Sequence, residues 1–387
     1  MMYSRPSSQR TLSLQSAIMQ ELQSHFTKNT ISLAQGVPFF PPPSEALEVV
    51  RSALDEPSIH RYSPDAGLPE LREALVGKLA GENGIDVELQ NVMATCGANQ
   101  AFMNAILAIA EPGDEIILLR PYYFNHEMAL RLAGIDPVFV DVDENYQPVP
   151  ENVEKAISAR TRAVVTVSPN NPTGAVYDGR RIGEINRLCW DDGIYHISDE
   201  TYEYFTFNGA VHHSPGAWDQ GQTITLHSFS KAYGMPGWRI GYLSYPAELE
   251  EGLLKVQDTL VICPSVIGQR MALECLKIGQ RYVDPFLRVM DQSRNVILAS
   301  LTELTDILSV PRTWGGYYFY VRIDGSELSG TELAIRLIKE HDVAVVPGEP
   351  FGAGQECCLR LSYGNVRPDT AEEGMVRFAK GVREIIG

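Results

Sequence analysis

Short apolar runs alternate with amphipathic helical patterns along the chain from about residue 92. Apolar and β-branched residues dominate the runs at 116–119, 138–142, 163–167, 194–197, 223–226 and 240–243. An apolar run without polar alternation is typical of a strand that is covered on both faces. The order of runs and helical patterns therefore predicts βαβ units, an α/β fold and a mainly parallel central sheet flanked by helices.

The N-terminal part of the chain predicts a helix followed by a connection. Ile18 and Leu22 belong to a nearly helical spacing that predicts an amphipathic helix over residues 12–26, packed on a small domain. Residues 31–43 form a short apolar run that ends in three prolines, which is typical of a rigid connection between domains. Ser44 is expected to cap the helix that follows.

Helical patterns and strands mix in the last third of the chain. A long helix is expected from about residue 285, and Ser329 with Glu332 predicts a capping box before another amphipathic helix. Strands are expected at 315–321, 343–346 and 359–363. This mixture predicts a smaller α+β domain. We expect a large domain over residues 45–284 and a small domain built from residues 1–44 and 285–387.

Length, charge and cysteine content narrow the class of protein. The chain has 387 residues, which exceeds the usual length of one domain. Its net charge of −17 argues against binding to nucleic acid. The six cysteines show no metal-ligand spacing and fit a reducing compartment, and no apolar run is long enough to span a bilayer. We expect a cytoplasmic protein without a metal site, a membrane segment or a nucleic-acid partner.

The stretch from Ser228 to Arg239 combines one lysine, two serines and an arginine on a glycine-rich backbone. Partial burial and neighbouring cations lower the pKa of a lysine amine, which can then form a Schiff base with an aldehyde. Ser228, Ser230 and Arg239 can hold a phosphate beside Lys231. An aldehyde and a phosphate on one small molecule suggest pyridoxal 5′-phosphate (PLP), although a solvated loop is the alternative for the same residues.

Enzymes that use PLP pair the lysine with an acidic partner for the pyridine nitrogen. Asp199 and Glu200 both follow a predicted strand, and each is a candidate for this carboxylate. Tyr202 can donate a hydrogen bond to the ring oxygen and so tune the pKa of the Schiff base. Asn171 lies in a loop rich in proline, asparagine and glycine after another predicted strand, and its neutral amide suits the same oxygen.

Three further positions could contact such a ligand. The turn after Thr95 opens a helix, whose free N–H groups make a natural phosphate site. Tyr122 and Tyr123 follow a predicted strand at the sheet edge where ligands bind, and either ring can stack on a pyridine or pack in the core. Arg360 can bind the carboxylate of an amino acid with two hydrogen bonds, or face water at a sheet edge.

Five separated segments together resemble the class I/II, fold type I family of PLP-dependent aminotransferases. They are Y-x-x-x-x-G-x-x-x-L-R from Tyr62, N-P-T-G from Asn171, D-x-x-Y from Asp199, S-x-S-K from Ser228 and R-L-S-Y from Arg360. The resemblance extends over about residues 30–380 and implies the PLP-transferase fold type I, with a large and a smaller domain.

The resemblance also implies a role for each matching residue. Lys231 would form the Schiff base and move a proton, with Asp199 and Tyr202 as catalytic partners. The residues implied to bind the cofactor are Ala98, Asn99, Tyr123, Asn171, Asp199, Tyr202, Ser228, Ser230, Lys231 and Arg239, with Tyr62 from the partner subunit of a homodimer. Those implied to bind substrate are Gly36, Asn171 and Arg360. From the sequence alone, a surface tyrosine beside a turn is the favoured interpretation of Tyr62, and a plain turn glycine is an equal alternative for Gly36.

We therefore expect an aminotransferase that moves an amino group between an α-amino acid and a 2-oxo acid, as a homodimer with shared active sites. A lyase or synthase on the same fold would use the same residues, and a regulator built on this fold would not be catalytic. Phe39, Tyr123 and Tyr317 favour aromatic or large neutral donors. No second arginine can be assigned to a distal carboxylate, so an aspartate specificity is a less supported alternative.

Overall fold

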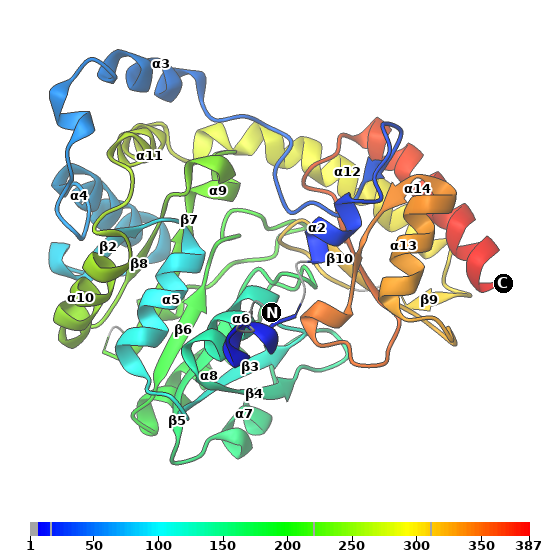
Figure 1. Cartoon of the computed structure of the whole chain (residues 1–387), viewed down its shortest axis with the longest axis horizontal. Helices are drawn as coiled ribbons and strands as arrows, with labels where there is room; N and C mark the ends of the chain where they lie inside the picture. The colour runs from blue at the N-terminus through cyan, green and yellow to red at the C-terminus, as the bar shows by residue number, and fades with distance from the viewer. Residues whose placement is uncertain (1–6, 16–17, 220, 310–311) are drawn as a thin grey trace, which may run out of the picture.

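A seven-stranded sheet forms the centre of the larger part of the molecule (Figure 1). The computed structural model describes residues 7–15, 18–219, 221–309 and 312–387. The strands, in sheet order, are β2 (Val92–Thr95), β8 (Gly241–Ser244), β7 (Thr223–Ser228), β6 (Tyr195–Asp199), β5 (Thr161–Val167), β3 (Glu115–Arg120) and β4 (Asp136–Asp141). Only β8 runs antiparallel to its neighbours, so the mainly parallel α/β sheet is confirmed.

Helices cover both faces of this sheet because the side chains of each strand alternate between the faces. In β3, Ile116 and Leu118 pack toward one side, and Ile117 and Leu119 pack toward the other. The first face is covered by α5 (Ala98–Ile109), α6 (Phe124–Ala133) and α10 (Glu250–Val261), and the second by α7 (Pro150–Ala156) and α8 (Gly179–Asp191). A third cluster joins α3 (Ser44–Ala53), α4 (Pro69–Lys78), α9 (Phe229–Ala232) and α11 (Val266–Ile278).

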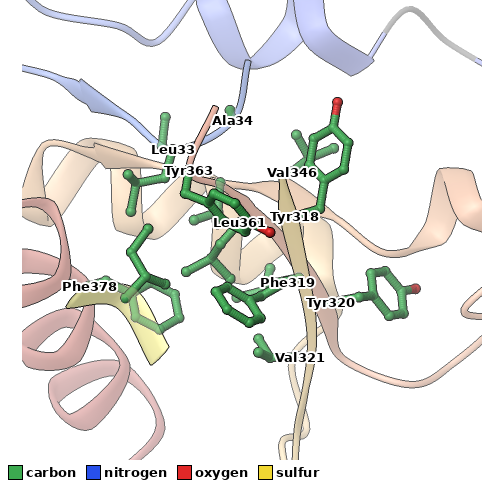
Figure 2. Packing of buried hydrophobic residues seen from close by; sticks show 14 of the residues in the cluster. Leu33, Ala34, Tyr318, Phe319, Tyr320, Val321, Val346, Leu361, Tyr363 and Phe378 are labelled. Atoms are coloured by element: carbon green, nitrogen blue, oxygen red, sulfur yellow. The ribbon is translucent and has the colours of Figure 1, made fainter. Parts of the chain in front are cut away.

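A second, four-stranded antiparallel sheet carries its own core. Its order is β12 (Val346–Pro347), β13 (Cys358–Ser362), β10 (Tyr318–Ile323) and β9 (Leu308–Ser309). The helices that cover it are α12 (Asp284–Thr302), α13 (Gly330–His341) and α14 (Pro368–Ile386). Phe319 and Leu361 point toward Phe378 of α14, whereas Tyr318 and Tyr320 point the opposite way (Figure 2). This alternation also sends Arg360, the partner of Tyr320 in β13, away from the helices.

The N-terminal segment completes this second core. The two-residue strand β1 (Ile31–Ser32) pairs in parallel with β11 (Val343–Ala344), and Leu33 and Ala34 are buried beside β13. The expected domain limits at residues 44/45 and 284/285 remain a prediction, although α12 begins at Asp284 and extends toward α14 (Figure 1).

Several expected elements differ from the structure. The helix expected over residues 12–26 is replaced by α1 (Gln9–Leu12) and α2 (Ile18–Gln23), with residues 16 and 17 outside the described part. Ser13 ends α1 because its hydroxyl bonds to the carbonyl of Arg10, which is how serine competes with helical hydrogen bonding.

Two local predictions were also wrong. Ser44 is the first residue of α3 rather than its cap, and its hydroxyl bonds to the Glu45 carboxylate. The strand expected at 343–346 is divided between β11 and β12, which pair in different sheets. In contrast, the capping box of Ser329 and Glu332 at the start of α13 is confirmed.

Candidate active site

A cavity of about 450 Å³ lies at the carboxyl ends of the parallel strands, where it meets β10 and β13 of the second sheet. Open α/β sheets bind ligands at this edge because the loops after neighbouring strands converge there. The expected site residues that line the cavity are Gly36, Ala98, Asn99, Tyr123, Asn171, Asp199, Tyr202, Ser228, Ser230, Lys231, Arg239 and Arg360. Tyr62 is the exception, because it is 78% exposed and does not line this cavity.

Lys231 projects into the cavity from α9, the single helical turn that follows β7. Ser228 caps this turn, since its hydroxyl accepts a hydrogen bond from the Ser230 amide. The Lys231 amine donates to the carbonyl of Gly36 over 2.7 Å. Burial, reinforced by the charges of Arg360 and Arg239 and opposed by that of Asp199, lowers the pKa of Lys231 from 10.5 to about 8. An amine with this pKa is available as a nucleophile near neutral pH.

One end of the cavity is built to hold an anion. Gly97 adopts φ +84° at the N-terminus of α5, and a Cβ there would lie 2.5 Å from Nη2 of Arg239. The glycine therefore lets the guanidinium close over the first turn of the helix. Hydrogen bonds within the chain occupy the amides of Gln100 and Ala101, and none occupies those of Ala98 and Asn99 among the described residues. Free N–H groups and the helix dipole favour a bound phosphate at this position.

Asp199 supplies a buried carboxylate at the end of β6. His126 of α6 lies 3.2 Å from its Oδ2 and stacks on Phe102, with ring centres 4.0 Å apart. Burial alone would raise the pKa of Asp199, but the bond to His126 and those to Thr201 hold it below the ordinary value. Asp199 therefore remains ionised. Glu200, the competing candidate, is fully buried outside the cavity, where it bonds to His212 and Ser214.

Arg360 belongs to β13 of the second sheet, and it lines the same cavity as Asp199. Its Nη1 donates to Oδ1 of Asn171 and its Nη2 donates to the carbonyl of Ala34, each over 2.8 Å. The guanidinium stacks on Tyr318 at 4.5 Å, and its Nε has no partner among the described residues. Arg360 is 4% exposed, so the alternative of an arginine that faces water is wrong.

Several tyrosines lie in or near the cavity, but not all of them line it. Tyr123 lines the cavity, whereas Tyr122 stacks on Phe139 with ring centres 4.9 Å apart. The hydroxyls of Tyr202 and Tyr318 lie 2.7 Å apart. Burial raises the pKa of Tyr202 well above its ordinary value, so this hydroxyl keeps its proton and can donate it in a hydrogen bond.

Two aromatic residues expected near the substrate lie elsewhere. Phe39 packs against Phe40 and Phe286, and neither it nor Tyr317 is among the residues that line the cavity. Tyr317 is fully buried, and its hydroxyl donates to the carbonyl of Gly36 over 3.0 Å. Phe39 therefore packs against α12, and Tyr317 holds the N-terminal segment at Gly36.

The model of the family described as aminotransferase class I and II matches residues 28–378. The chain belongs to this aminotransferase family. It is 36% identical to an aspartate/prephenate aminotransferase of Thermus thermophilus, over 92% of this chain and 91% of that protein. It is 32% identical to the aromatic aminotransferase ISS1 of Arabidopsis thaliana, over 98% of this chain and 97% of that protein.

Solved structures agree with the sequence comparison. The aspartate aminotransferase of Thermus thermophilus with maleate matches with a TM-score of 0.91 and 34% identity, over 98% of this chain and all of that chain. An aromatic aminotransferase of Pyrococcus horikoshii matches with a TM-score of 0.87 and 32% identity, over 95% of this chain and 99% of that chain. The protein is therefore a PLP-dependent aminotransferase of fold type I, which acts on an amino acid and a 2-oxo acid. The comparisons do not favour a lyase, a synthase or a regulator.

The residues present in this aminotransferase fit the cofactor. The N-terminus of α5, Ser230 and Arg239 would suit its phosphate, and the ionised carboxylate of Asp199 would suit a protonated ring nitrogen. The partly neutral amine of Lys231 suits its aldehyde. No helix in the described ranges is long and apolar enough to cross a membrane.

Several residues in the cavity or beside it could not be identified from the sequence. His126 carries no motif signal, because its meeting with Asp199 depends on how α6 packs over the sheet. Met19 and Gln23 come from α2, Gln35 and Val37 flank Gly36, and Tyr318 comes from β10. Thr201, Phe124 and Val167 complete this set. Proximity to an expected site segment points to Gln35, Val37, Phe124, Val167 and Thr201, and the others required the three-dimensional structure.

The structure also brings together one buried and two partly buried potential metal ligands that the sequence spacing did not indicate. The ligand atoms of Glu200, Glu203 and His212 lie within 4.8 Å of one another. Lys78 forms an ion pair with Glu203 and also donates to Asn83. A protein cation therefore already balances part of the charge of these carboxylates.

Proposed function

We propose that this aminotransferase acts on amino donors with neutral side chains, aromatic or large apolar ones above all, and that Lys231 and Arg360 carry its reaction. The observation that supports this proposal is the distribution of charge in the cavity. Its charged lining residues, within the described part of the chain, are Asp199, Lys231, Arg239 and Arg360.

Each of these four charges has a use in binding the cofactor or the part common to all amino acids. Arg239 serves the phosphate, Asp199 the ring nitrogen and Lys231 the aldehyde. Arg360 is then the one cation left in the described lining for the α-carboxylate, and it offers the two parallel N–H donors that such a group prefers. Among the described residues, no lining cation remains for a second carboxylate at the end of the donor side chain.

The reaction steps proposed for the protein concern position and proton transfer. When bound, PLP supplies the aldehyde that takes up the amino group and the ring that withdraws electrons from the α-carbon. Arg360 would turn the substrate by its carboxylate so that the α-hydrogen faces Nζ of Lys231. The free amine would then act as a general base and take this proton from the α-carbon. As a general acid, it would deliver the proton to the cofactor carbon on the other side of the transferred nitrogen.

Three neighbours are proposed to prepare this step. Asp199, ionised and held by His126, would keep the ring nitrogen protonated. Tyr202 and Asn171 would bond to the ring oxygen, and Asn171 already accepts a hydrogen bond from Arg360. This hydrogen bond would couple binding of the substrate carboxylate by Arg360 to the position of the cofactor ring. Tyr123 is proposed to stack on the ring from the cavity wall.

The proposal includes a homodimer in the cytoplasm. Tyr62 is largely exposed and absent from its own cavity, as expected for a residue that completes the site of a partner subunit. The six cysteines are all free thiols, which supports a reducing compartment.

A donor panel tests the substrate class and the role of Arg360. Aromatic, apolar and acidic donors are assayed with 2-oxoglutarate and with pyruvate, for the wild type and for Arg360→Ala. Wild-type kcat/KM should be about 100-fold higher for phenylalanine than for aspartate, because an unpaired carboxylate loses its hydration in the cavity. Loss of Arg360 should lower kcat/KM for every donor by about 2–5 kcal/mol of transition-state stabilisation.

The alternative of an acidic donor is supported by relatives that are named aspartate aminotransferases. It would be established by a wild-type preference for aspartate or glutamate, with an Arg360→Ala loss confined to those donors. In that case both the neutral substrate class and the assignment of Arg360 to the α-carboxylate would be wrong.

A further inference from the structure

The short helix α2 presents two different faces, and one of them forms part of the cavity wall. Ile18 and Leu22, one helical turn apart, are buried in the core of the second sheet. Met19 directly follows Ile18, Gln23 directly follows Leu22, and both Met19 and Gln23 line the cavity. The helical period therefore fixes Met19 and Gln23 toward the cavity for as long as Ile18 and Leu22 remain in the core.

Contacts on both sides hold the segment before α2 in place. The side-chain amide of Gln15 donates to Oε2 of Glu127 on α6, over 3.4 Å, and to the carbonyl of Pro350, over 3.3 Å. Glu127 in turn is an ion-pair partner of Arg131. The N-terminal segment is thus attached to the large sheet layer by α6 and to the second core by α2.

Uncharged side chains face the same space from the large sheet layer. Asn99, Tyr123 and Phe124 line the cavity there, and Val37 lines it beside Gly36. The Asn99 amide oxygen accepts a long hydrogen bond from Tyr123, over 3.5 Å. With Met19 and Gln23, these residues form a wall that combines apolar surface with neutral amides and offers no charge.

We propose that Met19 and Gln23 are specificity-determining residues, which form the wall that the side chain of the amino donor contacts. The flexible thioether of Met19 adapts to aromatic and branched side chains. The amide of Gln23 has no hydrogen-bond partner in the described part of the chain, so it is free for a neutral polar group at the end of the donor. This inference rests on the proposed function, because it assumes that Arg360 holds the α-carboxylate.

The decisive experiment places the missing cation in this wall. Gln23→Arg should increase kcat/KM for aspartate and glutamate by about three- to tenfold, since Gln23 lies at a solvent-exposed position where a new ion pair is partly screened. It should also tighten binding of a dicarboxylate, maleate, to the holoenzyme by a similar factor. This binding is measured without turnover, by titration calorimetry.

Gln20→Arg is the matched control. Gln20 lies on the same helix and is exposed, but it does not line the cavity. The Gln20→Arg variant adds the same charge to the same helix, and it should change neither the donor preference nor the binding of maleate. An equal gain in both variants, or a gain in neither, would overturn the role assigned to Gln23.

A second variant tests Met19 through size. Met19→Ala should lower kcat/KM for phenylalanine and leucine by about tenfold relative to that for alanine, because only the larger donors lose an apolar contact. Met19→Leu should retain the wild-type ratio. If Met19→Ala leaves the ratio unchanged, Met19 does not contact the donor side chain.

The two levels of the proposal fail in different ways. A wild-type enzyme that prefers acidic donors contradicts the proposed function itself. A wild-type enzyme that prefers neutral donors, with variants of Met19 and Gln23 that retain its preferences, contradicts only the assignment of the wall.

Discussion

The charge state of Lys231 is set by its surroundings rather than by the lysine itself. Burial lowers its pKa most, Arg360 and Arg239 lower it further, and Asp199 acts in the opposite direction. With a pKa of about 8, roughly one amine in ten is neutral at pH 7, compared with fewer than one in a thousand for an exposed lysine. The same arginines that are proposed to bind anions thus also prepare the amine.

Uptake of PLP by cofactor-free protein should report this pKa. Because only the neutral amine attacks an aldehyde, the uptake rate should rise about tenfold per pH unit below pH 7.5 and level off above about pH 8.5. The rate is followed by absorbance at fixed ionic strength. Arg360→Gln removes a cation, so its midpoint should move to higher pH. A wild-type rate that keeps rising beyond pH 10 would contradict the lowered pKa.

At the scale of the elements, strand alternation sends neighbouring residues to different environments. Asp199 and Ser228 face the cavity from the ends of β6 and β7, whereas their chain neighbours Glu200 and His227 are buried outside it. Farther along the same segment, Glu203 forms an ion pair with Lys78 of α4. Despite burial, the charges of Lys78 and His227 lower the pKa of Glu203, so this carboxylate is ionised at neutral pH.

Removal of Lys78 should destabilise the protein because the largely buried Glu203 charge then loses its ammonium partner. We expect Lys78→Met to lower the free energy of unfolding by about 3–5 kcal/mol at pH 7, measured by urea denaturation. Glu203 carries a lowered pKa, so its stabilising effect is complete above its unfolded pKa and is lost as the pH falls toward its folded value. The penalty of Lys78→Met should therefore shrink in acid.

An exposed lysine provides the control for this change. Lys255 pairs with Glu251 one turn away on α10, where both side chains are largely exposed. Lys255→Met should leave the unfolding free energy nearly unchanged, because solvent screens such pairs. The double variant of Lys78→Met with Glu203→Met should recover much of the loss. Equal effects at Lys78 and Lys255 would show that burial of the first pair is energetically unimportant.

The sequence was sufficient for elements with strong local signals. Unbroken apolar runs located the six strands expected for the large sheet to within two residues at each end. The loops after them carried Asn171, Asp199 and Lys231 into one cavity, as the parallel topology requires. The helix expected at residues 12–26 was wrong because apolar spacing does not reveal that the Ser13 hydroxyl donates to the carbonyl of Arg10 and competes with helical hydrogen bonding.

Contacts between distant elements could not be predicted in this way. His126 reaches Asp199 from α6, and Met19 and Gln23 reach the cavity from α2, so each depends on packing rather than on local pattern. The strand expected at 343–346 shows the same limit. Its four apolar residues fit one strand, but the competing partners β1 and β13 divide it between two sheets.

At the scale of the whole molecule, the cavity depends on both sheets at once. Arg360 comes from the second sheet and bonds to Asn171, which follows β5 of the first. The same guanidinium donates to Ala34 in the N-terminal segment. A change in the relative position of the two sheets would therefore alter the proposed carboxylate site directly.

The exposed Tyr62 extends this dependence to a second copy of the chain. Its segment is fixed on α10 and α11, where Gln257 donates to the carbonyl of Asp65 and Gln269 donates to Ser63. A cavity of about 570 Å³ opens beside Arg239 and is also lined by Cys96, Trp238 and Ile267. We propose that Tyr62 of one subunit enters this space in its partner and contributes its hydroxyl to the phosphate site.

Mixing two defective variants tests this arrangement. Lys231→Ala lacks the amine, and Tyr62→Ala should release PLP more readily, so each homodimer should have low activity at limiting PLP. If Tyr62 acts across the interface, a hybrid dimer contains one site with both residues intact and one with neither. Random exchange of subunits should then restore about a quarter of the wild-type sites, because half of the dimers are hybrids with one complete site each.

Activity and retained PLP are both measured after exchange and dialysis. The unmixed variants serve as controls, and sedimentation shows whether both still form dimers. Restoration requires that Tyr62 be supplied by the other chain, because a tyrosine acting within its own chain would leave every hybrid site with one defect. Dimers that exchange subunits without any gain would therefore exclude Tyr62 from the partner site and leave it a surface residue.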